Sequence, residues 1–286
     1  ADNGYAITVY KVERSLTGVF GGEETVLTST HTTTTYDDTG LTTSTDYYYR
    51  VSSTNALGEG AYSSTVTEKT FGVPSDIDDL SLTVISTTQI NLAWTEPALN
   101  GYSLVEYEIF RSEDGTTYTS LATQTGTSYS STGLNANDLY YYKVTTTNGF
   151  GTSGDSNIEF DPTLPTPPAT VTLTVNSATQ ITVQWNTPAG DQQTSYKIEI
   201  STDGTNWTDE VASTGNTNQS YVDTGLTTLT TYYYKVSTIN PSGTSVASGS
   251  SSAETWGPPD APTNLTAVAI VNVDIDLDWD APGDTH

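Results

Sequence analysis

Four aspartates alternate with large apolar residues near the end of the sequence. The acidic set is Asp274, Asp276, Asp278 and Asp280, and the apolar set between them is Ile275, Leu277 and Trp279. Residues two apart share one face of a strand, so the carboxylates would line one side and the apolar side chains the other. A row of like charges is unfavourable unless water, salt or a cation such as Ca²⁺ relieves it. The pattern is compatible with a solvated face that discourages edge aggregation, a calcium site, or a contact with a basic patch on a neighbouring subunit.

Groups that could support covalent or acid–base catalysis are scarce. Cysteine is absent, and histidine occurs only at His31 and His286. Neither histidine has a nearby Ser and Asp in a recognisable nucleophile arrangement. Paired carboxylates for glycoside hydrolysis would also need a cleft around the scissile bond. We therefore expect no enzymatic activity, and no cofactor apart from the calcium considered above.

Asn-X-Ser/Thr sequons are a third source of site chemistry. They make three asparagines candidates for glycosylation: Asn206, Asn218 and Asn264. Such sequons also arise by chance in a chain this rich in threonine. Attached glycans would place the protein outside the cell.

The charge balance excludes several classes of partner. There are 34 acidic residues against 8 basic ones, for a net charge of −26. A nucleic-acid partner needs a basic face, and an anionic membrane surface would repel this chain. No apolar run approaches the ~20 residues of a membrane-spanning helix. With neither Cys nor Met, even at position 1, the sequence indicates an extracellular or cell-surface protein that is a processed chain, a fragment or an excerpt.

The elements that carry these residues are internal repeats. Three blocks recur at intervals of about 93 residues, each alternating apolar and polar residues as half-buried strands do. The block that ends in Trp occupies residues 90–94, 181–185 and 275–279. The block that is rich in Tyr occupies residues 47–51, 140–144 and 232–236. The block that begins with Tyr occupies residues 10–15, 107–112 and 196–201. No segment longer than ten residues has helical periodicity. The sequence therefore predicts an all-β protein.

These blocks resemble the fibronectin type III family, whose domains are seven-stranded, immunoglobulin-like sandwiches. The residues that carry the resemblance are Trp94, Trp185 and Trp279 on the second strand and Tyr47, Tyr140 and Tyr232 on the sixth. One departure is Thr43, which replaces the proline of the family pattern. The resemblance covers essentially the whole chain. It implies that each of the three tyrosines is a corner residue whose hydroxyl bonds nearby backbone.

Proline-containing linkers set the predicted domain boundaries. Residues 73–163 and 164–257 each form a complete fibronectin type III domain. Residues 1–72 form an incomplete one with strands C to G, and residues 258–286 supply only strands A and B. The last segment running into Asn3 and Tyr5 parallels the loop that follows Trp94. The sequence thus predicts a linear array of sandwiches that is circularly permuted, so that residues 258–286 complete residues 1–72 of a neighbouring unit.

An incomplete sandwich would expose its core and its strand edges. We expect a homopolymer, assembled head to tail, in which the terminal hairpin is donated to the next unit. The interface residues would be Leu265, Ala267, Ile275, Leu277 and Trp279 from the hairpin, and Tyr10, Val12, Tyr47, Tyr49 and Val51 from the head. The chain could also be one period of a covalent tandem array, or a protease-trimmed fragment.

A different class of function is a spacer or adhesion module of a larger secreted protein. Alternation places Tyr48, Tyr141 and Tyr233 on the outward face of their strands, where tyrosine rings can bind sugars. Exposed tyrosine on a strand is also ordinary. Glycan binding therefore remains an alternative to the fibre.

Overall fold

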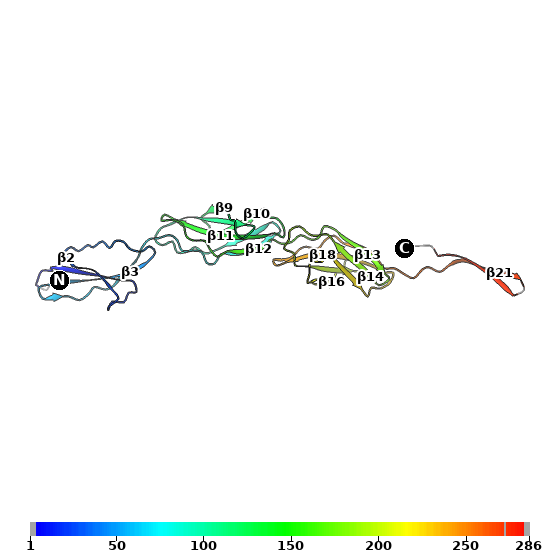
Figure 1. Cartoon of the computed structure of the whole chain (residues 1–286), viewed down its shortest axis with the longest axis horizontal. Coiled ribbons are helices and arrows are strands. Elements are labelled where there is room, and N and C mark those ends of the chain that lie inside the picture. Colours follow the sequence, from blue (N-terminus) through cyan, green and yellow to red (C-terminus); the bar gives the residue numbers. More distant parts are fainter. Residues whose placement is uncertain (1–3, 272, 283–286) are drawn as a thin grey trace. The chain divides into compact units, whose positions relative to one another are not determined.

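The computed structural model describes residues 4–271 and 273–282, and within these residues the chain forms strands β1 to β22 and no helix (Figure 1). The predicted all-β class is confirmed. Contacts divide the chain into two compact units, whose boundary passes through the second repeat. The first unit comprises Ala1–Thr83, Asn91–Ser130 and Tyr140–Phe160, and the second comprises Val84–Ile90, Ser131–Leu139 and Asp161–His286.

The third repeat is a complete two-sheet sandwich inside the second unit. One sheet has the order β13-β14-β17, and the other has the order β16-β15-β18-β19 with β20 also paired to β18. All the pairings between these strands are antiparallel. The bounds are β13 Val171–Ser177, β14 Gln180–Trp185, β15 Ser195–Ser201, β16 Thr208–Val211, β17 Ser220–Thr224, β18 Thr231–Asn240, β19 Gly243–Thr244 and β20 Ser251–Glu254.

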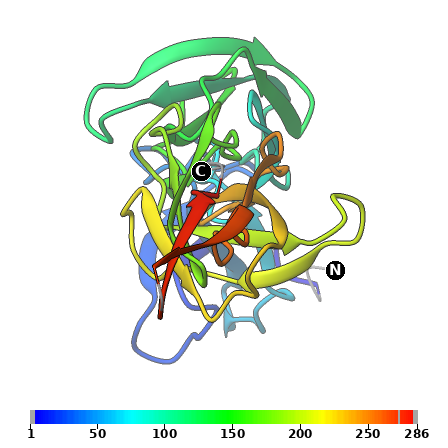
Figure 2. The ribbon, with the colours of Figure 1, turned by 90° about the vertical axis from the view of Figure 1, so that its right-hand side faces the viewer.

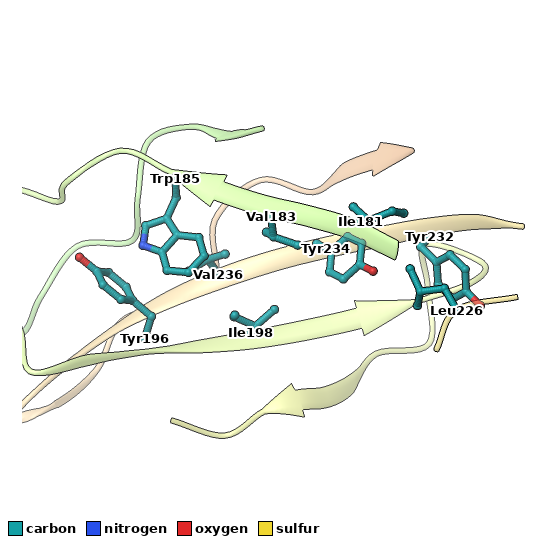
Figure 3. Close-up of a cluster of buried hydrophobic side chains, with 9 residues drawn as sticks. All are labelled: Ile181, Val183, Trp185, Tyr196, Ile198, Leu226, Tyr232, Tyr234 and Val236. Atoms are coloured by element: carbon teal, nitrogen blue, oxygen red, sulfur yellow. The ribbon is translucent and has the colours of Figure 1, made fainter. Parts of the chain in front are cut away.

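The core of this sandwich follows from the period-2 pattern of its strands. Figure 3 shows apolar side chains of β14 facing those of β15 and β18 across the gap between the sheets. Trp185 and Tyr196 meet edge to face, with ring centroids 5.0 Å apart. The buried cluster consists of Ile181, Val183, Trp185, Tyr196, Ile198, Leu226, Tyr232, Tyr234 and Val236. Burying alternate residues from both sheets is what holds a sandwich of this kind together.

The second repeat has the same two sheets, with orders β10-β7-β6 and β12-β11-β8-β9. Trp94 follows β7 and meets Tyr107 of β8 edge to face at 5.4 Å, as Trp185 meets Tyr196. The bounds are β6 Ser81–Ser86, β7 Gln89–Ala93, β8 Leu104–Ser112, β9 Thr119–Gln124, β10 Ser128–Thr132, β11 Leu139–Asn148 and β12 Glu159–Pro162.

In the first repeat, which we call the head, the described residues 4–72 form a single sheet. Its order is β2-β1-β3-β4, with β5 also paired to β3. Residues 32–45, all of which the structure describes, form no strand. Within this segment, residues 35–39 are equivalent to residues 220–224, which form β17 in the third repeat. The bounds are β1 Val9–Ser15, β2 Thr25–His31, β3 Asp46–Asn55, β4 Gly58–Glu59 and β5 Val66–Lys69.

The last two strands form a separate hairpin, β21 (Thr263–Val271) and β22 (Asp274–Asp280). Figure 2 shows them as two adjacent arrows at the red end of the colour scale. Ala267 pairs with Leu277, and Ala269 pairs with Ile275. Every residue described in the two strands is exposed. The hairpin therefore folds as two paired strands with no second layer against its apolar face.

The corner tyrosines are as predicted in the two repeats where the bond can be read. The Tyr47 hydroxyl accepts a hydrogen bond from the backbone N–H of Thr42 at 2.9 Å. The Tyr232 hydroxyl accepts one from the backbone N–H of Thr227 at 3.0 Å. The head thus has the local corner geometry of a complete domain, although it has only one sheet.

Candidate subunit interface

An open groove covers one face of the head sheet. Its volume is about 910 Å³, and it lies over strands β1 and β3 and the strandless segment that follows β2. The five head residues predicted from sequence all line it: Tyr10, Val12, Tyr47, Tyr49 and Val51. The groove is where a second sheet packs in the complete repeats.

Exposure of equivalent residues shows how much of the core is missing. Val51 on β3 is 36% exposed, whereas Val144 and Val236, which occupy the same position in the second and third repeats, are 0% exposed. Tyr49 is half-buried in the head, and its counterpart Tyr234 is fully buried. An uncovered apolar face of this kind makes the groove a candidate interaction surface.

One carboxylate lies inside the groove with two partners. Arg14 Nη1 contacts Asp38 Oδ2 at 2.9 Å, and the Tyr49 hydroxyl donates to the same oxygen at 2.8 Å. Burial, together with the Asp38 hydrogen bond, raises the pKa of Tyr49 to about 12. The groove is thus apolar over the strands, and the Asp38 carboxylate at its side is paired with Arg14.

The third repeat shows what happens to this acid when the sandwich is complete. There the Tyr234 hydroxyl donates to Asp223 Oδ2 at 2.7 Å, and Asp223 is 2% exposed. Burial raises the pKa of Asp223, and it also raises the pKa of Tyr234, with a further contribution from the hydrogen bond to Asp223. Asp38 and Tyr49 already hold the same pair geometry before any partner covers them.

The opposite face of the head sheet carries an ionic cluster that sequence analysis missed. Glu13 is buried between Arg50, at 2.7 Å, and Lys11, at 2.6 Å, and it accepts a further bond from the Tyr62 hydroxyl at 2.8 Å. Burial alone would raise the pKa of Glu13, but these three donors hold it below its ordinary value. The available signal was cross-strand pairing, since Glu13 lies opposite Arg50 in the β1–β3 register. The cluster closes that face, so the groove face is the one left for a partner.

The hairpin presents the complementary apolar surface. Ile275, Leu277 and Trp279 of β22 are 65%, 53% and 54% exposed. The same positions of β14 in the third repeat are 0%, 0% and 5% exposed. Leu265 and Ala267 of β21 are exposed as well. The residues predicted to enter a neighbour's core are therefore available to a partner.

The aspartate row lies on the other face of β22. Asp276 is paired with Val268 and Asp278 with Thr266, and Asn264 donates to Asp280 at 2.5 Å. Among residues 4–271 and 273–282, no three acidic, His or Cys side chains gather in a metal-binding group. Binding of calcium to this row stays a prediction.

The remaining predicted site residues lie on exposed backbone. Asn206, Asn218 and Asn264 are exposed, and Asn206 is fixed in a turn by its bonds to Asp203. His31 ends β2 beside the groove, with Nε2 2.8 Å from Thr33 Oγ1. His286 and Asn3 fall outside the described residues. Nothing in this arrangement builds a nucleophile or a proton-transfer set around His31.

No helix in the described parts of the chain is long and apolar enough to cross a membrane.

Comparison with known proteins gives the family. The fibronectin type III domain model matches residues 73–160 and 166–254. Exoglucanase B of Cellulomonas fimi is 30% identical over 272 residues, which are 88% of this chain and 23% of that protein. Endoglucanase B of the same organism is 34% identical over 60% of this chain and 17% of its own length. Mouse neogenin is 28% identical over 74% of this chain and 15% of its own length. The chain spans less than a quarter of the length of these relatives.

Solved structures that match this chain include the FN1–FN3 domains of chicken CNTN1, at 18% identity and a TM-score of 0.35, covering 90% of this chain and 91% of that one. A two-domain fibronectin type III segment of chicken tenascin is 17% identical, with a TM-score of 0.42, and covers 63% of this chain and 99% of that one. With two matched domains and the sheet orders described above, the chain belongs to the fibronectin type III family.

Proposed function

We propose that the chain is a structural unit of an extracellular filament or surface array, in which hairpin β21–β22 of one unit completes the head of the next. The observation that carries the proposal is the match between two uncovered surfaces. The head groove lacks the sheet that β13, β14 and β17 form in the third repeat. The hairpin has the order and the Trp-ending pattern of β13 and β14. The role is mechanical, without catalysis.

The third repeat supplies the expected register of the donated strand. There β14 pairs antiparallel with β17, and Val183 lies opposite Tyr221. Leu277 occupies the position of Val183, and Tyr36 occupies the position of Tyr221. In the assembled joint Leu277 would therefore lie opposite Tyr36, which lines the groove and is exposed. Pairing would convert residues 35–39 of the head into a strand.

Burial at this joint is large enough to support association. Leu265, Ile275, Leu277 and Trp279 would each gain ~1.5–3 kcal/mol on full burial, roughly 6–12 kcal/mol together. This gain is comparable with the ~5–15 kcal/mol stability of a whole domain. Association itself costs several kcal/mol in lost freedom of motion, and the backbone bonds of the new strand pair help to offset this cost.

The joint uses different surfaces on its two sides, so it does not close on itself. A contact of this kind repeats from unit to unit and produces a filament. The same pairing would also join successive periods of a covalent tandem array. The two forms share an architecture and differ in whether a peptide bond crosses the joint. The mass of the native polypeptide after full denaturation separates them, because a non-covalent unit has a mass near 30.5 kDa and an array a multiple of it.

Assembly of the purified 286-residue chain tests the proposal. Leu277→Asp places a charge where an apolar side chain should enter the groove, so it should abolish polymers seen by negative-stain microscopy and sedimentation. Asp278→Ser, on the opposite face of β22, is the matched control and should polymerise. Short rods from the unmodified chain at all concentrations would contradict the proposal.

The second candidate is a spacer or adhesion module of a larger secreted protein, with glycans as its ligands. The relatives favour it, because the chain spans less than a quarter of two proteins named as glucanases. In that case isolated chains would stay monomeric, and binding to a glycan array would depend on outward-facing tyrosines such as Tyr48, which the structure shows as half-buried.

A further inference from the structure

Two junctions inside the chain join consecutive repeats in a similar way. At the first, which lies within the first unit, Phe71 of the linker packs against Tyr102 of the second repeat, with ring centroids 5.0 Å apart. Tyr102 in turn lies 6.2 Å from Phe150. Asn148 donates to the carbonyl of Gly72 at 2.8 Å. The linker is thus held by an aromatic cluster and by one asparagine.

A glycine receives the linker at this junction. Gly101 has a φ of +92°, in the left-handed region that L side chains rarely adopt. A Cβ at Gly101 would collide with the ring of Phe71. Gly190 holds the equivalent position at the second junction, with a φ of +77°, and a Cβ there would collide with the backbone of Asn137 in the preceding repeat rather than with a linker side chain. At both junctions the preceding repeat occupies the space beside this glycine.

The head carries the receiving half of a third junction. Gly4 has a φ of +89°, close to that of Gly101, yet among residues 4–271 and 273–282, its chain neighbours apart, no atom lies within 4 Å of the place where its Cβ would be. Tyr5 follows Gly4 as Tyr102 follows Gly101, and it is half exposed. Asn55 accepts a bond from the N–H of Leu57 at 2.9 Å, as Asn148 does from Phe150 at 2.8 Å. The backbone of the head is therefore already arranged to receive a linker residue.

The donating half lies at the end of the third repeat. Trp256 follows Thr255 as Phe71 follows Thr70. The two threonines hold equivalent positions, since Thr255 Oγ1 donates to Thr227 O at 2.6 Å and Thr70 Oγ1 donates to Thr42 O at 2.5 Å. Trp256 is 44% exposed, so it has apolar surface available for a further contact.

We infer that Trp256 of one unit packs against Gly4 and Tyr5 of the next unit, forming a third copy of the junction at the joint between subunits. The inference rests on the proposed strand donation, because the donated hairpin is what brings the third repeat of one unit next to the head of another. It adds a second, separate contact to the joint. Hairpin insertion completes the sandwich, and the Trp256 contact fixes the angle at which the sandwich meets its neighbour.

Variants at Trp256 test this contact apart from strand donation. The readouts are the critical concentration for assembly and the persistence length of the filament. Trp256→Ala should raise the critical concentration about tenfold and make the filament more flexible, because it removes the aromatic contact. Trp256→Phe should stay close to the unmodified chain, since Phe71 performs the same task at the first junction. Trp207→Ala is the matched control, because the contact of Trp207 lies within the third repeat, where Lys235 Nζ is 3.9 Å from the centroid of the Trp207 ring.

Strand donation is measured in the same samples by an engineered disulfide between chains that carry Asp37→Cys and Asp276→Cys. The chain has no other cysteine, so this disulfide is specific. The cross-link could form normally while Trp256→Ala has the same critical concentration and persistence length as the unmodified chain. That result would overturn the Trp256 junction and leave the proposed function standing. Absence of both cross-link and polymer in the otherwise unmodified chain would overturn the proposed function and the junction with it.

Discussion

The Tyr49 hydroxyl donates a hydrogen bond to Asp38 at 2.8 Å on the uncovered face of the head. The equivalent bond in the third repeat joins Tyr234 to Asp223 at 2.7 Å, in a closed core. The same pair therefore exists in an open and a covered setting within one chain. This difference gives a direct comparison of the two states.

Removing the donor should have unequal effects in the two repeats. Tyr234→Phe leaves the buried Asp223 without its partner, which should destabilise the third repeat by about 1.5–3 kcal/mol. Tyr49→Phe in unassembled chains should cost less, because water can reach Asp38. Hydrogen exchange of β18 and β3 amides measures both losses. If Tyr49→Phe and Tyr234→Phe lowered the stability of their repeats equally in monomers, the head face would already be covered.

The stability of the third repeat should depend on Asp223 ionisation. Burial raises the pKa of Asp223 above its ordinary value of 3.8, so the folded state favours the protonated acid. Its contribution to stability is then fully present below 3.8 and is lost as the pH rises through the raised pKa.

Asp223→Asn keeps an acceptor for Tyr234 and has no charge to bury. It should stabilise the third repeat near neutral pH and flatten this part of the pH dependence. Hydrogen exchange of β14 amides across that range checks the effect. A variant less stable than the parent at neutral pH would refute the explanation.

Leu277 and Val183 occupy equivalent strand positions with different surroundings. Val183→Ala removes buried atoms from the third repeat and should lower its unfolding free energy by roughly 1–3 kcal/mol. Leu277→Ala should leave monomer stability nearly unchanged, because Leu277 is already exposed. It should instead weaken assembly by about a hundredfold, from the ~2–5 kcal/mol of a Leu→Ala change in a core. Denaturation of monomers measures the unfolding free energy, and sedimentation of filaments measures the strength of assembly. If Leu277→Ala lowered monomer stability without weakening assembly, the account would be contradicted.

Assembly should strengthen with added salt. In the expected register Asp276 lies opposite Asp37, and both residues are exposed in the structure. Directly opposed like charges cost roughly 0.2–1 kcal/mol, and salt screens them. Asp276→Lys should therefore lower the critical concentration at low salt and reduce its salt dependence.

Glu96→Lys in the second repeat is the control for that charge change, because it alters net charge equally at an exposed position that belongs neither to the groove lining nor to the hairpin. Identical behaviour of the two variants would attribute the salt effect to net charge and would remove the support for this register.

The fold could be predicted because its signals are local and periodic. Alternation around Trp185 and Tyr232 fixed which side chains face the core, and the repeat of that alternation in the head identified Tyr10, Val12, Tyr47, Tyr49 and Val51, all of which line the groove. The hairpin could be predicted for the same reason, and its two strands are observed at Thr263–Val271 and Asp274–Asp280.

The polar contacts could not be read in this way. Glu13 meets Arg50 and Tyr62, and Asp38 meets Arg14, across 24 to 49 positions of sequence. These contacts depend on strand register, which alternation alone leaves open. The special conformation of Gly4 is also invisible in sequence, since glycine is frequent here and only its φ distinguishes this one.

The central claim is that the hairpin of one unit pairs with residues 35–39 of another, in the register of β14 and β17. Disulfide trapping tests it most directly. Chains carrying both Asp37→Cys and Asp276→Cys should form a ladder of covalent oligomers on mild oxidation, because these positions match Val222 and Thr182, which are partners in the third repeat. Asp37→Cys with Asp280→Cys, four residues along the strand, should form few cross-links. No ladder, or equal ladders from both variants, would contradict strand donation in this register.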